Sequence, residues 1–216
     1  MIGLGLKPTG DTFRVLCLGA HSDDIEIGCG GTVLYLRETY PNIEFQWVVF
    51  NAVGVRESEA RRAASLFAGP ALREITLKSF PDGFMPYVGG EVKTAFEQLK
   101  QSPSPDLIFC PWRGDAHQDH RLVSELTWNT FRNHLIFEYE IPKYDGDMGR
   151  PNLFVPLESA QCQNKIDNLF DAFQSQHSKP WFDKSTFLAV MRLRGMESNS
   201  PSHHAEAFHC RKLVLG

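Results

Sequence analysis

The stretch RVLCLGAHSDDIE, residues 14–26, decides how this chain folds. Its apolar half is typical of a buried β-strand, and the strand ends abruptly at His21, Asp23 and Asp24. A second apolar run, LIFC at 107–110, is followed in the same way by DAHQDH at 115–120. Two strands that each end in histidine and aspartate indicate a metal site at one edge of a sheet.

Apolar runs alternate with helical patterns through about the first two-thirds of the chain. We expect strands over about 13–20, 43–51, 74–79 and 106–111, and helices over about 29–39, 55–67, 91–101 and 120–131. This alternation predicts an α/β fold, a Rossmann-like three-layer sandwich with a mainly parallel sheet covered by helices on both faces.

The alternation loosens after residue 134, and the function of this region stays open. Strands at 135–141 and 153–157 flank a polar turn and predict an added hairpin. Helices near 166–173 and 183–194 and a final strand at 207–215 are expected to follow. The chain is therefore predicted to form a single domain over 1–216, with strand and helix additions at its C-terminal end.

The composition is that of a soluble globular protein, with 42% hydrophobic, 12% aromatic and 22% charged residues. A net charge of -4 gives no electrostatic reason to expect a nucleic-acid partner. The five cysteines are scattered without a C-x-x-C pair, and neither a signal-peptide pattern nor a membrane-spanning apolar run is present. We expect a cytoplasmic protein with reduced thiols and no integral membrane segment.

In a doubly wound sheet, functional groups gather beyond the carboxyl ends of the strands. His21, Asp24 and His120 can supply two imidazole nitrogens and one carboxylate to a single ion. Three such ligands with a fourth position for water describe a catalytic zinc site, and Fe²⁺ is the alternative ion. The glycines at 28, 30 and 31 match no phosphate-binding pattern and are better explained by close packing of a helix.

The remaining polar residues of the two motifs fit hydrolysis. Asp23 is adjacent to a ligand and free to take a proton from water that the metal has activated. His117 either donates to the developing oxyanion or protonates the leaving group. Asp119 is expected to orient one imidazole by accepting its other N–H, and Glu26 either plays a similar part or faces solvent.

At this point the chain resembles the LmbE-like superfamily, which includes the zinc-dependent GlcNAc-phosphatidylinositol de-N-acetylases (PIG-L) and bacterial deacetylases of thiol precursors and antibiotic sugars. The pattern A-H-P-D-D-x-E of that family is matched by residues 20–26, with Ser22 at the usual proline, and H-x-D-H is matched by residues 117–120. The resemblance implies a zinc-dependent N-deacetylase, an amidohydrolase acting on the linear amide of an N-acetylglucosamine-type amino sugar or its conjugate.

The resemblance also implies the role of each residue. His21, Asp24 and His120 would bind zinc, Asp23 would be the general base and His117 would stabilise the tetrahedral intermediate. Weaker similarities point to Arg56 and to Asp82, in the loop FPDG at 80–83, as substrate contacts. Family members commonly assemble, so a homo-oligomer is one option, but the sequence specifies neither the oligomeric state nor the sugar conjugate of the small-molecule substrate.

Two other functions remain open at this stage. A non-heme iron(II) oxygenase uses the same two histidines and one carboxylate, although such enzymes usually have β-rich folds. A non-catalytic carbohydrate-binding module would need neither Asp23 nor His117. Roles for His203, His204 and Glu206 stay open.

Overall fold

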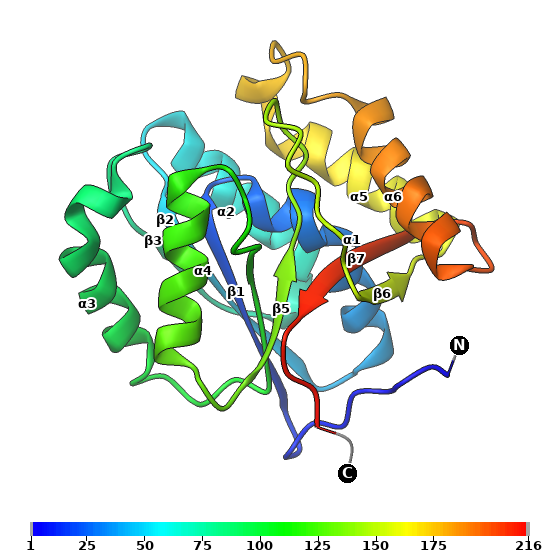
Figure 1. The fold of residues 1–216 in the computed structure, drawn as a ribbon, viewed down its shortest axis with the longest axis horizontal. Coiled ribbons are helices and arrows are strands. Elements are labelled where there is room, and N and C mark those ends of the chain that lie inside the picture. Colours follow the sequence, from blue (N-terminus) through cyan, green and yellow to red (C-terminus); the bar gives the residue numbers. More distant parts are fainter. Residues whose placement is uncertain (1, 215–216) are drawn as a thin grey trace.

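The computed structural model describes residues 2–214 and contains a seven-stranded sheet in the order β3-β2-β1-β4-β5-β7-β6 (Figure 1). The parallel strands are β1 (Phe13–His21), β2 (Ile43–Asn51), β3 (Leu72–Leu77), β4 (Leu107–Pro111) and β5 (Leu135–Tyr139). Strand β7 (Ala205–Cys210) pairs antiparallel with β5 and with β6 (Leu153–Pro156). The predicted α/β fold with a mainly parallel sheet is confirmed.

Helices cover both faces of the sheet because successive residues of each strand point to opposite faces. Val15 and Cys17 of β1 pack into a core shared with α1 (Asp24–Thr39), α2 (Val55–Ala68), α5 (Ser159–Ala172) and α6 (Lys184–Ser198). Leu16 and Leu18 pack on the other face against α3 (Gly89–Leu99) and α4 (Gln118–Thr130). The result is a three-layer sandwich.

The order of the strands reverses between β1 and β4. From β1 the chain builds outward through β2 and β3, and it then returns to place β4 on the other side of β1. Ligands bind at such a reversal of strand order, outside the carboxyl ends of the strands. Both polar motifs follow these two adjacent central strands, so the topology brings them together.

Helix α1 begins at Asp24, five positions before the predicted start at Cys29. The glycines at 28, 30 and 31 disfavour a regular helix, which explains the later expected start. The structure accommodates them with a break, since Cys29 has non-helical backbone angles (φ -141°, ψ 15°). The first turn of this helix therefore carries the polar motif itself.

The predicted hairpin of 135–141 and 153–157 is wrong, because β7 lies between β5 and β6. Local pattern cannot reveal this insertion, since the inserted strand comes from the end of the chain. The final strand is also shorter than expected, ending at Cys210 rather than at 215, a position outside the described residues. The predicted helices near 166–173 and 183–194 are present as α5 and α6.

None of the helices within residues 2–214 combines the length and the apolar character needed to cross a membrane. The five cysteines are free thiols, as predicted, and four of them are buried.

Candidate metal centre

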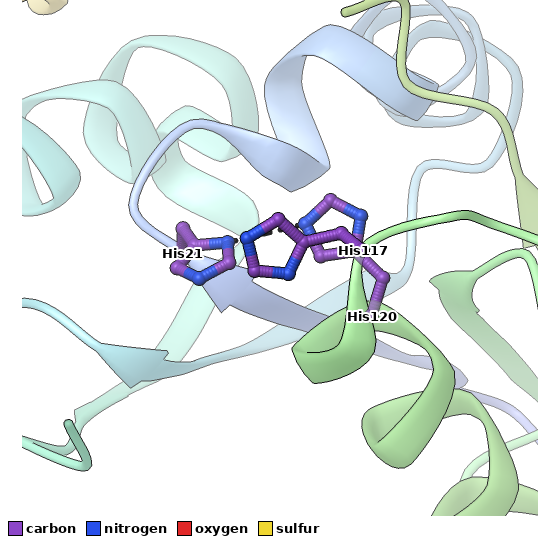
Figure 2. A group of neighbouring side chains, drawn as sticks. All are labelled: His21, His117 and His120. Atoms are coloured by element: carbon purple, nitrogen blue, oxygen red, sulfur yellow. Dashed lines mark hydrogen bonds between the residues drawn. The ribbon is translucent and has the colours of Figure 1, made fainter. Parts of the chain in front are cut away.

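The two polar motifs converge beyond the ends of β1 and β4. His21 is the last residue of β1, and His117 is the N-cap residue of α4. His120 lies in the first turn of that helix. Figure 2 shows the rings of these three histidines gathered between the end of β1 and the start of α4.

The three predicted metal ligands face one another. Nδ1 of His21 lies 3.1 Å from Nε2 of His120. Oδ1 of Asp24 is 3.4 Å from Nε2 of His120, and Oδ2 of Asp24 is 3.6 Å from Nδ1 of His21. Asp24 is itself held in place, because its Oδ2 accepts the backbone N–H of His21 at 2.8 Å. Two imidazole nitrogens and a carboxylate thus point toward one small volume.

The outer nitrogen of each ligand histidine faces a carboxylate. Nε2 of His21 lies 3.2 Å from Oδ2 of Asp119, and Nδ1 of His120 lies 2.9 Å from Oδ2 of Asp115. Nε2 of His21 is placed to donate its N–H to Asp119, whereas Nδ1 of His120 makes no hydrogen bond of good geometry among residues 2–214, although it lies close to Asp115. An imidazole that donates its outer N–H to a carboxylate presents the lone pair of its inner nitrogen, as metal-binding histidines commonly do. With the outer nitrogens of both rings protonated, the two inner lone pairs are 3.1 Å apart and need a proton or a cation between them, so in this tautomer the donor set fits a metal ion.

The charges around the site favour a positive centre. Burial alone would lower the pKa of His120, but Asp24 and Asp115 raise it to about 9. For His21, the effect of burial is likewise outweighed, and the pKa lies well above its ordinary value because of Asp24, Asp119 and Asp82. Burial would raise the pKa of Asp24, but His120 and His21 hold it well below its usual range. Without a metal, protons on the two histidines balance this cluster of carboxylates.

Asp119 contacts both His21 and the loop on which Asp82 lies. Its carboxylate accepts the backbone N–H of Gly83 at 2.8 Å and that of Met85 at 3.2 Å. Asp82 is held so that its Oδ1 lies 3.1 Å from Nε2 of His21, while its side chain remains 71% exposed. The structure therefore places the Asp119 carboxylate within hydrogen-bond distance of the His21 ring. Asp82 lies at the exposed edge of the same site.

The position of His117 fixes which of its nitrogens can donate. Its Nδ1 accepts the backbone N–H of Asp119 at 3.2 Å, so in the neutral ring the proton is on Nε2. Burial lowers the pKa of His117, and the nearby His120 and His21 lower it further. The ring centroid lies 4.7 Å from the centroid of each ligand histidine. His117 is thus a neutral hydrogen-bond donor beside the proposed ion.

His117 is also close enough to be a ligand itself. One donor atom each from His21, His117 and His120 lie within 4.8 Å of one another, and the same holds for His21, Asp82, His117 and Asp119. The structure therefore offers donors beyond the three that the motifs predict, and neither of these two groups includes the predicted ligand Asp24.

Asp23 and Arg56 form a pair at the edge of the site. Nη2 of Arg56 lies 2.8 Å from Oδ1 of Asp23, and the Asp23 side chain is 8% exposed. Nη1 of Arg56 binds Glu59 at 2.8 Å, and Glu59 accepts from the backbone and hydroxyl of Ser175. Arg56, predicted only as a substrate contact, is therefore also the partner of the proposed base.

Sequence reasoning assigned no role to Asp115 or Lys143. Asp115 contacts both His120 and Nζ of Lys143, the latter at 2.9 Å. Asp115 could have been predicted as part of the site, because it lies between the end of β4 and the start of α4, the helix that carries His120. Nothing in the sequence indicates Lys143, because it lies in the loop after β5, far from both motifs in the chain. Glu26 does not face solvent. It is fully buried, and its two oxygens have no hydrogen-bond partner among residues 2–214.

Comparisons with known proteins found a matching family model, a curated relative and similar solved structures. The model of the family described as "PIG-L: GlcNAc-PI de-N-acetylase" matches residues 16–131. A curated relative, diacetylchitobiose deacetylase of Thermococcus kodakarensis, is 26% identical over 132 residues. That match covers 53% of this chain and 48% of the relative, so the chain spans about half the length of that protein.

Two solved structures share the fold at low sequence identity. The N,N'-diacetylchitobiose deacetylase of Pyrococcus horikoshii has a TM-score of 0.70 at 20% identity, covering 93% of this chain and 84% of the other. GalB, the 4-carboxy-2-hydroxymuconate hydratase of Pseudomonas putida, has a TM-score of 0.68 at 14% identity, covering 95% and 98%. Because these two proteins are named for different reactions, the shared fold by itself does not identify the reaction.

Proposed function

Since the chain belongs to the PIG-L family, described as GlcNAc-PI de-N-acetylase, we propose that it hydrolyses the acetamide of an N-acetylated amino sugar, N-acetylglucosamine or one of its conjugates. The observation that carries this proposal is the pair of facing nitrogens on His21 and His120, each backed by a carboxylate, beside Asp24. The activity in the name of the Thermococcus relative supports the same reaction class.

We propose that His21, Asp24 and His120 hold one divalent ion, and that this ion is zinc. Two imidazole nitrogens and one carboxylate oxygen suit zinc, and a site with three protein ligands leaves a position for reaction. A bound zinc ion would lower the pKa of a water molecule to about 7 and polarise the acetamide carbonyl.

Asp23 is the proposed general base. Its carboxylate is oriented by Arg56, and it is the neighbour in sequence of the proposed ligand Asp24. As the oxygen of water bonds to the acetyl carbon, Asp23 accepts one proton from that water. When the carbon–nitrogen bond breaks, the proton passes to the departing nitrogen, so the products are acetate and a free amine.

His117 is the proposed oxyanion donor. Its Nδ1 is occupied by the backbone of Asp119, which leaves the Nε2–H to stabilise the negative charge that develops on the carbonyl oxygen. Its lowered pKa means that the ring is neutral near pH 7, so it donates a hydrogen bond rather than acting as an imidazolium. Of the two roles that the sequence left open, we therefore propose the first.

Arg56 and Asp82 are the proposed substrate contacts. The side chain of Arg56 is 19% exposed and that of Asp82 is 71% exposed, so both can reach a sugar beside the metal centre. Hydroxyl groups of a sugar can pair with both a guanidinium and a carboxylate.

A binding module or an iron(II) oxygenase fits the observations less well. Binding alone needs neither a base paired with an arginine nor a neutral histidine whose free N–H lies next to the metal ligands. The mainly parallel sheet also differs from the β-rich folds on which oxygenases with this triad are usually built.

The test is acetate release from a panel of N-acetylglucosamine conjugates by zinc-loaded protein. The panel contains free N-acetylglucosamine, its disaccharide, an alkyl glycoside and a phosphodiester conjugate, and the free amine is measured in parallel. We expect equal amounts of acetate and amine from at least one conjugate. Oxygen consumption by iron-loaded protein, with no acetate from any conjugate, would instead favour the oxygenase.

A further inference from the structure

Helix α1 contains a break that leaves backbone groups without their usual partners. In an unbroken helix, the N–H of Gly31 would donate to the carbonyl of Ile27, and that of Thr32 to the carbonyl of Gly28. At the break near Cys29, both N–H groups instead donate to the carboxylate of Glu206. The distances are 2.8 Å from Gly31 to Oε1 and 2.6 Å from Thr32 to Oε2.

The other side of the break is completed by Lys165. Its Nζ donates to the carbonyl of Ile27 at 2.6 Å and to Oε1 of Glu206 at 2.6 Å. Both side chains are buried, with exposed fractions of 3% for Lys165 and 4% for Glu206. The ion pair therefore replaces helical hydrogen bonds that the break removes.

The charges match the two helix ends that the break creates. Glu206 places a carboxylate at the N-terminal end of the second segment, and Lys165 places an ammonium group at the C-terminal end of the first. Each charge has the sign that the helix dipole favours at that end. The pair thus stabilises the two helix ends at the break, and an unbroken helix would have no such ends to stabilise.

Close packing explains why glycines stand at two positions beside the break. Gly28 lies directly against the ring of Tyr139, and Gly30 against the ring of Phe67, so neither position has room for a Cβ atom. The hydroxyl of Tyr139 donates to the carbonyl of Leu18 on β1 at 2.6 Å. The first segment of α1, which begins at the predicted ligand Asp24 and follows the predicted base Asp23, is therefore held closely over the sheet.

We propose that Lys165 and Glu206 are positioning residues for Asp23 and Asp24. By fixing the break, the pair sets the direction of the first segment of α1 relative to β1, and with it the placement of both carboxylates. Lys165 lies on α5 and Glu206 on β7, which flank α1 (Figure 1). The inference rests on the proposed function, since it concerns the residues to which that function assigns the metal and the proton.

The test compares Lys165→Met and Glu206→Gln with a second buried ion pair that lines the same small cavity. Arg194 and Glu140 form a pair at 2.9 Å whose side chains are 4% and 5% exposed. Their other contacts include Gly149 and Glu197, and not the backbone of α1. The controls Arg194→Met and Glu140→Gln therefore remove a similar buried interaction beside the break, but none of the hydrogen bonds that the break itself receives.

The first measurement is amide hydrogen exchange, which needs neither metal nor substrate. The N–H of Ile27 donates to the carbonyl of Asp23 at 3.0 Å and reports on the first segment, whereas Gly31 and Thr32 report on the break itself. We expect faster exchange at these three amides in Lys165→Met and Glu206→Gln than in control variants of matched global stability. Equal exchange rates in the variants and the controls would overturn the proposal.

The second measurement is zinc affinity by equilibrium dialysis, together with kinetics well below the unfolding temperature. We expect zinc binding to weaken by about 10-fold to 100-fold, the usual cost of losing groups that orient ligands, and kcat to fall with little change in KM. Lys165→Arg, which keeps the charge, should restore part of both. Wild-type affinity and kcat in the destabilised variants would mean that the pair is merely structural.

Two further measurements cover variants that do not fold and a wild-type protein that proves inactive. Should the single variants fail to fold, the double variant Lys165→Met with Glu206→Leu leaves no unpaired buried charge and is measured in their place. Should wild-type protein neither bind zinc nor release acetate, the proposed function fails. The exchange of Ile27, Gly31 and Thr32 then still supports or overturns the role of the pair in placing the first segment.

Discussion

Residues 13–131 and residues 132–214 contribute to the site in different ways. The first region provides the histidines and carboxylates, each delivered by the end of a strand or the first turn of the helix that follows. The second region provides none of the proposed ligands or catalytic groups, yet its charged side chains reach into the first. Lys143 contacts Asp115, while Lys165 and Glu206 complete the break in α1. The proposed ligands and catalytic groups therefore lie in the first region, whereas their support comes from both, since Asp115 and Asp119 also contact the histidines.

This difference means that substitutions in the two regions should fail in different ways. A change in a catalytic group of the first region should reduce turnover while leaving the fold and the metal intact. A change in a supporting group should act through metal affinity or orientation, and should be smaller.

The largest expected effect on turnover comes from Asp23→Asn. Loss of the base should reduce kcat by about 10²-fold to 10⁴-fold, the contribution typical of general base catalysis. Asparagine can still accept from Arg56, so zinc content and thermal stability should stay near those of the wild type. Steady-state acetate release and metal analysis provide the check, and full activity in this variant would remove Asp23 from the mechanism.

His117→Ala should have the next largest effect. Removing one preorganised oxyanion donor typically costs about 10²-fold to 10³-fold in kcat. Zinc should still bind with one equivalent per chain, because the proposed ligand set does not include His117. A loss of zinc from this variant would show instead that His117 is a ligand, as its position also allows.

Asp115→Asn tests the support of a ligand. Because Asp115 faces the outer nitrogen of His120, its loss should weaken zinc binding by about 10-fold to 100-fold. Lys143→Met, which alters the same contact from the second region, should have a smaller effect in the same direction. Zinc dissociation constants for both variants give the comparison, and a larger loss for Lys143→Met would reverse the assigned order.

The last prediction is a pH dependence of metal binding, whose size is set by the pH change and not by a substitution. The pKa of His120 in the metal-free protein is raised to about 9, so near pH 7 the ring holds a proton that the metal must displace. Zinc affinity should therefore rise by about tenfold per pH unit for each proton displaced, and His120 should stop contributing to this rise above its pKa. Calorimetric titrations in buffers of different ionisation enthalpy measure the released protons. Affinity that is independent of pH between 7 and 9 would contradict this picture.

The sequence allowed much of the first region to be predicted, for physical reasons. A strand that ends in His21 and a strand that ends before His117 must meet if they are neighbours in a parallel sheet, and apolar runs identify such strands. The sequence predicted that Asp119 would accept an imidazole N–H, but not that this imidazole belongs to His21 of the other motif. These inferences needed only local pattern and one rule about strand ends.

The second region could not be predicted in this way. The insertion of β7 between β5 and β6 depends on pairing between segments far apart in the chain, which no local pattern records. The same is true of Glu206, whose partners Gly31 and Thr32 lie more than 170 positions away. Long-range contacts of buried charges require the folded structure.

The measurement that most directly tests the central claim is the zinc content of wild-type protein and of His21→Ala, Asp24→Ala and His120→Ala, determined by elemental analysis after dialysis against zinc. We expect one zinc ion per wild-type chain and far less than one in each variant. Acetate release should be lost on chelation and restored by zinc. Wild-type protein without bound zinc, or variants that keep a full equivalent, would contradict this claim.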